Sequence, residues 1–117
     1  MSKINKFFKL AKKIAKTGDS KEAKRRYRLG AIGLRNDGVI VCSSNICTRK
    51  PHPRAHAEAR ISNKLTKYSI VYVVRIGYNN QLLPAKPCKS CLAILKNKHI
   101  SKIYYSISDT EYGIIYF

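Results

Sequence analysis

Acidic side chains are scarce in this sequence. Six Asp and Glu stand against 24 Lys and Arg, which gives a formal net charge of +18. An AT-rich coding bias explains abundant Lys but does not explain the scarcity of Asp and Glu. Self-repulsion at this net charge destabilises a compact state unless a polyanion offsets it. The composition therefore predicts nucleic acid as the macromolecular partner.

The sequence also lacks a long uncharged apolar run. Lysine recurs every few residues near the N-terminus, so we expect neither a signal peptide nor a membrane span. The default compartment is then the cytoplasm, where the four cysteines stay reduced and suit metal binding better than disulfides. A length of 117 residues predicts one domain over 1–117, with a basic helix and connector over 1–28 and a core over 29–117.

Hydrophobic periodicity and turn residues predict a chain that alternates strands and helices. Apolar residues at helical spacing predict a helix over 3–16, which we expect to pack on the protein's own sheet rather than on a membrane. Asn36-Asp37-Gly38 predicts a hairpin turn. The other expected elements are strands 27–35, 39–44, 68–76, 101–106 and 112–117, helices 53–65 and 88–97, and a loop over 77–86. Only five residues separate the last two strands, so they must pair antiparallel if they are adjacent.

Two short motifs, about thirty residues apart, carry zinc-ligand side chains. His56 and Glu58 form a His-x-Glu motif, and Cys88 and Cys91 belong to a Pro-Cys-x-x-Cys motif. Three protein ligands, His56, Cys88 and Cys91, leave the fourth tetrahedral position open, which is typical of a catalytic zinc. Glu58 can face the metal without binding it and can shuttle protons. Both motifs fall at predicted helix N-termini, which favour thiolates and developing negative charge.

A structural zinc knuckle is the alternative reading of the same cysteines. Its fourth ligand would come from a further thiol or imidazole, and the candidates are Cys42, Cys47, His52 and His99. Such a site has no use for Glu58 beside its ligand. Cys42 lies in a predicted strand, where a small core residue is the simpler interpretation.

Together, His-x-Glu and Pro-Cys-x-x-Cys resemble the signature of the cytidine deaminase-like superfamily. The resemblance implies a three-layer α/β/α fold with a five-stranded mixed sheet and an antiparallel C-terminal hairpin. It also implies Zn²⁺ as cofactor, Glu58 as the catalytic acid and base, and addition of water to C4 of cytosine with loss of ammonia. The substrate contacts that it implies are Asn45, Ala57, Pro87 and Tyr105.

His56, the terminal hairpin and the net charge most resemble small phage, viral or bacterial toxin-type nucleic-acid cytosine deaminases. This branch implies single-stranded DNA rather than RNA as the substrate, and a monomer. The side chains expected to contact nucleic acid flank the motifs or lie in the basic connector: Lys24, Arg25, Arg26, Arg49, Lys50, His52, Arg54, Lys86 and Lys89. Tyr104, Tyr105 or Tyr112 is a candidate for stacking on a base.

Other functions stay open at this point. A free cytidine, deoxycytidine or dCMP deaminase would share the same site, as would an RNA or adenine deaminase. A catalytically silent zinc protein that binds nucleic acid would keep the metal ligands without the reaction.

Overall fold

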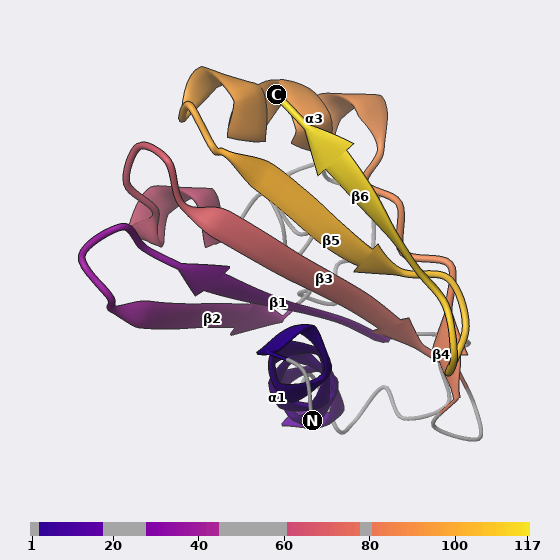
Figure 1. The fold of residues 1–117 in the computed structure, drawn as a ribbon. Helices are drawn as coiled ribbons and strands as arrows, with labels where there is room; N and C mark the ends of the chain where they lie inside the picture. Colours follow the sequence, from indigo (N-terminus) through magenta and orange to yellow (C-terminus); the bar gives the residue numbers. More distant parts are fainter. Residues whose placement is uncertain (1–2, 18–27, 45–60, 78–80) are drawn as a thin grey trace.

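The computed structural model describes residues 3–17, 28–44, 61–77 and 81–117 (Figure 1). The helices are α1 (Lys3–Thr17), a 3-10 turn η3 (Ser62–Lys64) and α3 (Lys89–Asn97). The strands are β1 (Arg28–Leu34), β2 (Ile40–Ser44), β3 (Ile70–Ile76), β4 (Leu82–Leu83), β5 (Lys102–Ser106) and β6 (Tyr112–Tyr116).

The strands form one mixed sheet in the order β2-β1-β3-β5-β6. β3 and β5 are parallel, and every other pair is antiparallel, including the C-terminal hairpin of β5 and β6. α1 covers one face of the sheet and α3 lies on the other, which gives three layers (Figure 1). The predicted α/β/α fold, its five strands and the terminal hairpin are confirmed.

Two details differ from the sequence-based expectation. The segment 77–86 is not wholly a loop, because the short strand β4 pairs with Arg75 and Ile76 at the end of β3 and makes the sheet six-stranded. β3 begins two residues later than predicted, since a turn closed by Ser69 Oγ donating to Thr66 O at 2.7 Å places Tyr68 outside the strand. Apolar Leu82 and Leu83 form too short a run to predict a strand from its pattern.

The predicted hairpin between β1 and β2 is confirmed. Gly38 takes φ +89°, a left-handed conformation that costs glycine little. The Asp37 carboxylate accepts the Val39 N–H at 3.0 Å and an N–H of the Arg35 guanidinium at 2.7 Å. The Val39 hydrogen bond, with a smaller contribution from Arg35, lowers the pKa of Asp37.

α1 packs its apolar side on the sheet, as predicted. Phe7, Phe8, Ala11 and Ala15 are buried in one core cluster with residues of β1, β3 and β5. α1 approaches β1 closely at Gly30, where a Cβ would meet the backbone of Ala11 and Ala15. No helix in the described ranges is long and apolar enough to cross a bilayer.

A second core cluster fills the opposite side of the sheet. Leu95 of α3 packs there with Ile61 and Leu65, which flank η3, and with Ile103 of β5. Only the end of the predicted helix 53–65 lies within the described residues, and its helical conformation at Ile61 passes into η3. The chain that follows the His-x-Glu motif therefore enters the core on the same side as α3.

Candidate active site

The first turn of α3 carries both cysteines of the Pro-Cys-x-x-Cys motif. Cys88 is the N-cap residue, in an extended conformation, and its carbonyl oxygen accepts the Leu92 N–H at 2.9 Å. Cys91 lies one turn further on and is fully buried, whereas Cys88 is exposed. Residues three apart on a helix lie on one side of it. Both thiols thus lie at the start of α3, within a residue of where the pattern placed them.

Ser106, at the end of β5, fixes the loop that leads to Cys88. Its hydroxyl donates to Leu83 O at 2.7 Å, and its carbonyl oxygen accepts the Ala85 N–H at 2.8 Å. Ser106 is almost wholly buried, so both hydrogen bonds are shielded from water. Pro87 is buried as well. The sequence analysis missed this positioning role; its only signal is a hydroxyl directly after the Ile-Tyr-Tyr run of β5.

His56 and Glu58 lie outside the described residues, as do the predicted substrate contacts Asn45 and Ala57 and the candidate ligand Cys47. The same holds for the basic residues Lys24, Arg25, Arg26, Arg49, Lys50, His52 and Arg54. Ile61 follows Glu58 by three residues and is fully buried in the same cluster as Ala85 and Leu95.

The described residues test part of the structural-zinc alternative. Across these ranges no three His, Cys, Asp or Glu side chains converge as a metal site, so neither Cys42 nor His99 joins Cys88 and Cys91. Cys42 packs against the α1 side of the sheet, as expected of a core residue. His99 follows the far end of α3, roughly 13 Å along the helix from Cys88.

The donors at the start of α3 fit zinc. Two thiolates are soft ligands that select zinc over magnesium or calcium. No acidic side chain lies in the first turn, and the positive end of the helix stabilises thiolate charge there. Two thiolates and one imidazole would leave the fourth zinc position open for chemistry.

Five other residues named by the sequence analysis lie in the described part of the chain, and one of them, Tyr104, is buried on the α1 side of the sheet. Lys86 and Lys89 are both exposed, on either side of Pro87 and Cys88. Tyr105 is half-buried on the α3 side, and its ring lies over Gly113 of β6. Tyr112 is exposed on the opposite side of the sheet, where it contacts Phe8.

Solved structures of several cytidine deaminases share this fold. The cytidine deaminase from Burkholderia pseudomallei aligns with a TM-score of 0.70 and 13% identity, over 99% of this chain and 93% of its own. The cytidine deaminase from Mycobacterium leprae gives 0.63 and 15%, over 97% and 94%. That from Mycobacterium tuberculosis gives 0.57 and 17%, over 91% and 85%. At these identities the likeness concerns the fold alone.

No curated protein sequence matches this chain significantly. The family model described as the cytidine and deoxycytidylate deaminase zinc-binding region matches residues 1–107, which include both motifs. The metal of this family is zinc, as the two motifs predicted. The chain belongs to the cytidine and deoxycytidylate deaminase zinc-binding family, and this membership supports zinc-dependent deamination of a cytosine base.

Proposed function

We propose that this protein is a hydrolytic deaminase that converts cytosine to uracil in single-stranded DNA. The observation that carries the proposal is the pair of thiols at the start of α3, one exposed and one buried, in a chain of a zinc-binding deaminase family. His56, Cys88 and Cys91 would hold the zinc. When bound, zinc lowers the pKa of water and acts as a Lewis acid.

Glu58 moves the protons of the reaction. It accepts the two protons of the attacking water in turn, and delivers one to N3 of the base and the other to the leaving amino group. The base is contacted by Asn45, Pro87 and Tyr105, and by the backbone N–H of Ala57. The target base must be out of any stack to reach the site, which favours a single strand.

The charge supports nucleic acid rather than a free nucleoside as the substrate. Lys86 and Lys89 are exposed beside the cysteine motif, and the whole chain carries a net charge of +18. A nucleoside has no phosphate and gains little from these charges. An oligonucleotide gains from each phosphate contact and loses affinity steeply with salt. The nucleic-acid side chains Lys24, Arg25, Arg26, Arg49, Lys50, His52 and Arg54 belong to the same proposal.

A free cytidine or deoxycytidine deaminase is the second candidate. It is favoured by the fold, which matches three structures titled cytidine deaminase, each covered over most of its own length. Such an enzyme would act on deoxycytidine as well as on an oligonucleotide, and its rate would have little dependence on salt.

The test compares deamination rates on an oligonucleotide and on deoxycytidine across a salt series. We expect the oligonucleotide to react faster at low salt, with a steep decline as salt rises. The affinity for the oligonucleotide is measured over the same salt series. Replacing Lys24, Arg25 and Arg26 together by Gln should make the slope of log affinity against log salt concentration shallower by about 2. The reason is that each phosphate contact to a single strand contributes ~0.7 to that slope.

The matched control replaces Lys67, Lys96 and Lys98 by Gln. All three are exposed, and the hydrogen bond from Tyr68 N–H to His99 O places them together at the end of α3 remote from Cys88. This variant loses the same charge but should keep most of the salt slope. Equal rates on both substrates, with no salt slope in the unmodified protein, would instead identify a free-nucleoside enzyme.

A further inference from the structure

Stacked and tilted rings connect α1 to the edge of the sheet. Phe7 stacks on Tyr72 at 4.8 Å between centroids, and Tyr72 stacks on Tyr104 at 4.9 Å. Tyr112 of β6 ends this row, 5.9 Å from Tyr104 and 5.8 Å from Phe8. The row begins inside the core and reaches the surface at Tyr112, which is 43% exposed.

The outer strand β6 presents an apolar stripe on this same side. The β5–β6 register pairs Ser106 with Tyr112 and Lys102 with Tyr116, so alternate residues of both strands face the α1 side. Tyr112, Ile114 and Tyr116 form the stripe, and Tyr116 is 70% exposed. α1 packs against β1, β2 and β3, and β6 lies at the far edge of the sheet (Figure 1). The described elements therefore leave the stripe partly exposed, least at Ile114 and most at Tyr116.

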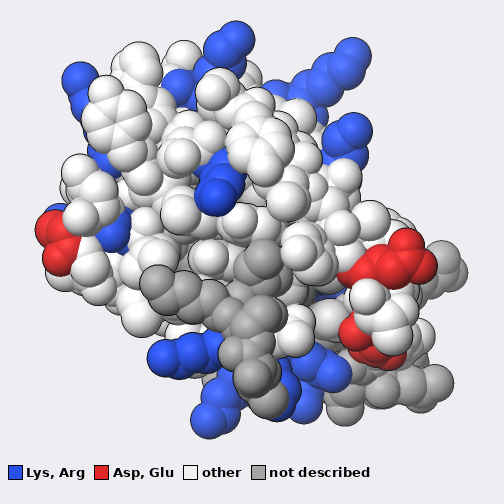
Figure 2. Space-filling view, viewed as in Figure 1, with Lys and Arg blue, Asp and Glu red and all other residues white. Residues whose placement is uncertain are grey.

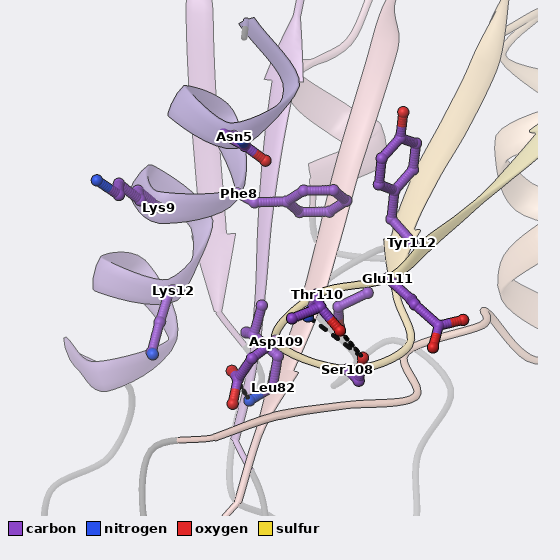
Figure 3. Close-up of a pocket in the computed structure, with 11 residues that line it drawn as sticks. Asn5, Phe8, Lys9, Lys12, Leu82, Ser108, Asp109, Thr110, Glu111 and Tyr112 are labelled. Carbon is purple, nitrogen blue, oxygen red and sulfur yellow. Dashed lines mark hydrogen bonds between the residues drawn. The ribbon is translucent and has the colours of Figure 1, made fainter. Parts of the chain in front are cut away.

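A cleft of about 700 Å³ adjoins the stripe where α1 faces the turn between β5 and β6 (Figure 3). Phe8 extends from α1 toward Tyr112 (Figure 3). Lys9 and Lys12 of the same helix line the cleft, and the end of the Lys9 side chain points away from it in this view. The turn supplies polar groups on the other wall, including the Asp109 carboxylate, which accepts the Leu82 N–H at 2.8 Å. The volume is that of a small-molecule site.

Lysines flank the stripe as well as the cleft. Lys102 lies across from Tyr116 in the register, and its Nζ is 5.2 Å from the centroid of the Tyr104 ring. Figure 2 shows a largely uncharged surface in this view, with one basic side chain within it, others above and below it, and acidic groups at its left and right edges. Two acidic residues, Asp109 and Glu111, line the cleft itself on the side of the turn. Aromatic faces beside ammonium groups suit bases linked by phosphates.

We propose that the β6 stripe and its adjoining cleft are a stacking platform for single-stranded nucleic acid outside the active site. Bases stack on Tyr112 and Tyr116, which are roughly 13 Å apart along the strand, and phosphates contact Lys9, Lys12 and Lys102. The proposal deepens the proposed function and rests on it for the identity of the strand.

The charge of the chain argues for this occupant over a second copy of the protein. Two copies would each bring a net charge of +18, and a shared face would bring their lysines together. A polyanion removes that repulsion and gains from the release of counterions.

The cleft also adjoins the loop that carries the zinc ligands. Ser106 lines the cleft and holds Leu83 and Ala85 through its two hydrogen bonds, three to five residues before Cys88. A strand stacked on β6 can therefore pass over this end of the sheet toward Cys88. The platform would hold nucleotides that flank the target base.

The test measures affinity for two probes by fluorescence anisotropy at fixed salt. One is a 15-nucleotide thymidine strand, which contains no cytosine and is not consumed; the other is an abasic strand with the same phosphates. Tyr116→Ala, alone and combined with Tyr112→Leu, should weaken binding of the thymidine strand by on the order of 5- to 150-fold per lost stack. Binding of the abasic strand should change less than twofold.

Tyr68→Asn is the matched control. Tyr68 is 68% exposed, as Tyr116 is, but lies in the turn before β3, and Asn tolerates its φ of +65°. This variant should bind both probes like the unmodified protein. Because Tyr116 is so exposed, Tyr116→Ala should keep the fold, and the melting temperature checks this.

Three results would overturn the platform: an equal loss on both probes, the same loss in Tyr68→Asn, or unchanged affinity in Tyr116→Ala accompanied by a change from dimer to monomer. The unmodified protein's rates on oligonucleotide and deoxycytidine are measured separately. A platform that fails while the oligonucleotide remains the better substrate leaves the proposed function standing. Faster turnover of deoxycytidine would refute that function while the stacking result stands.

Discussion

Replacing Gly30 by Ala tests how α1 is seated on the sheet. The added Cβ would meet Ala11 O, Ala15 N at 2.7 Å and Ala15 Cβ at 2.9 Å. Two of these atoms are helix backbone, so no rotamer change relieves the contact and α1 must move away from β1. Overpacking of a buried site costs about 1–3 kcal/mol, and we expect the upper end, about 3 kcal/mol, because backbone must shift.

Urea and thermal denaturation followed by circular dichroism measure this loss. About 3 kcal/mol corresponds to a fall in melting temperature of roughly 12 °C for a domain of this size. Because α1 carries Phe8, Lys9 and Lys12, the variant should also bind single strands more weakly.

Gly38→Ala is the control for the general cost of replacing a glycine. Its Cβ would meet nothing within 4 Å, and only its φ of +89° opposes the change, at about 1 kcal/mol. If Gly30→Ala lost no more stability than Gly38→Ala, the close seating of α1 on β1 would be wrong.

Three further predictions concern the metal, the acid–base residue and pH. The protein should hold about one zinc per chain, and Cys91→Ser, at a fully buried position, should lower both the zinc content and the melting temperature; full activity without zinc would contradict this. Glu58→Gln should keep fold and zinc but slow deamination by ~10²–10⁴-fold, and a near-normal rate would exclude its proton-transfer role. Burial, with a smaller contribution from Tyr104, raises the pKa of Tyr72, so stability should be intact below about pH 10 and fall as pH rises through the raised value. Denaturation between pH 9 and 11 should show a smaller fall in Tyr72→Phe, and an equal fall would refute that cause.

Periodicity and turn chemistry were enough to predict most of the fold. The alternation of Phe7, Phe8, Ala11 and Ala15 with lysines predicted a helix that packs on the sheet, because that spacing gives one apolar side. The five-residue spacing between the last strands predicted their antiparallel pairing. β4 was missed because its two residues pair only where the end of β3 leaves a free edge, which is a tertiary effect.

The candidate site divides in the same way. The Pro-Cys-x-x-Cys pattern predicted two thiols at a helix start, since the motif is local and its spacing is that of one helical turn. Ser106 was not predictable, because its role depends on a loop twenty residues earlier in the chain. The stacking role that we propose for the α1 side was predicted only in part. Tyr112 was a stacking candidate in the sequence and Tyr116 was not, because only the sheet order shows which strand lies beyond α1.

The two faces of the sheet have different chemistry, and this difference would let one small domain both hold a strand and act on one base, as we propose. The α3 side buries Cys91 and Leu95 in the core, and Cys88 beside them stays exposed. The α1 side exposes tyrosines and lysines at β6, where sequence-tolerant stacking needs an accessible surface. Ser106 connects the two faces. Its hydrogen bonds hold the loop that leads to Cys88, and the same residue lines the cleft on the α1 side. A strand held at β6 would thus act on the reaction by placing its next base, through affinity and orientation rather than through the chemistry of the zinc site.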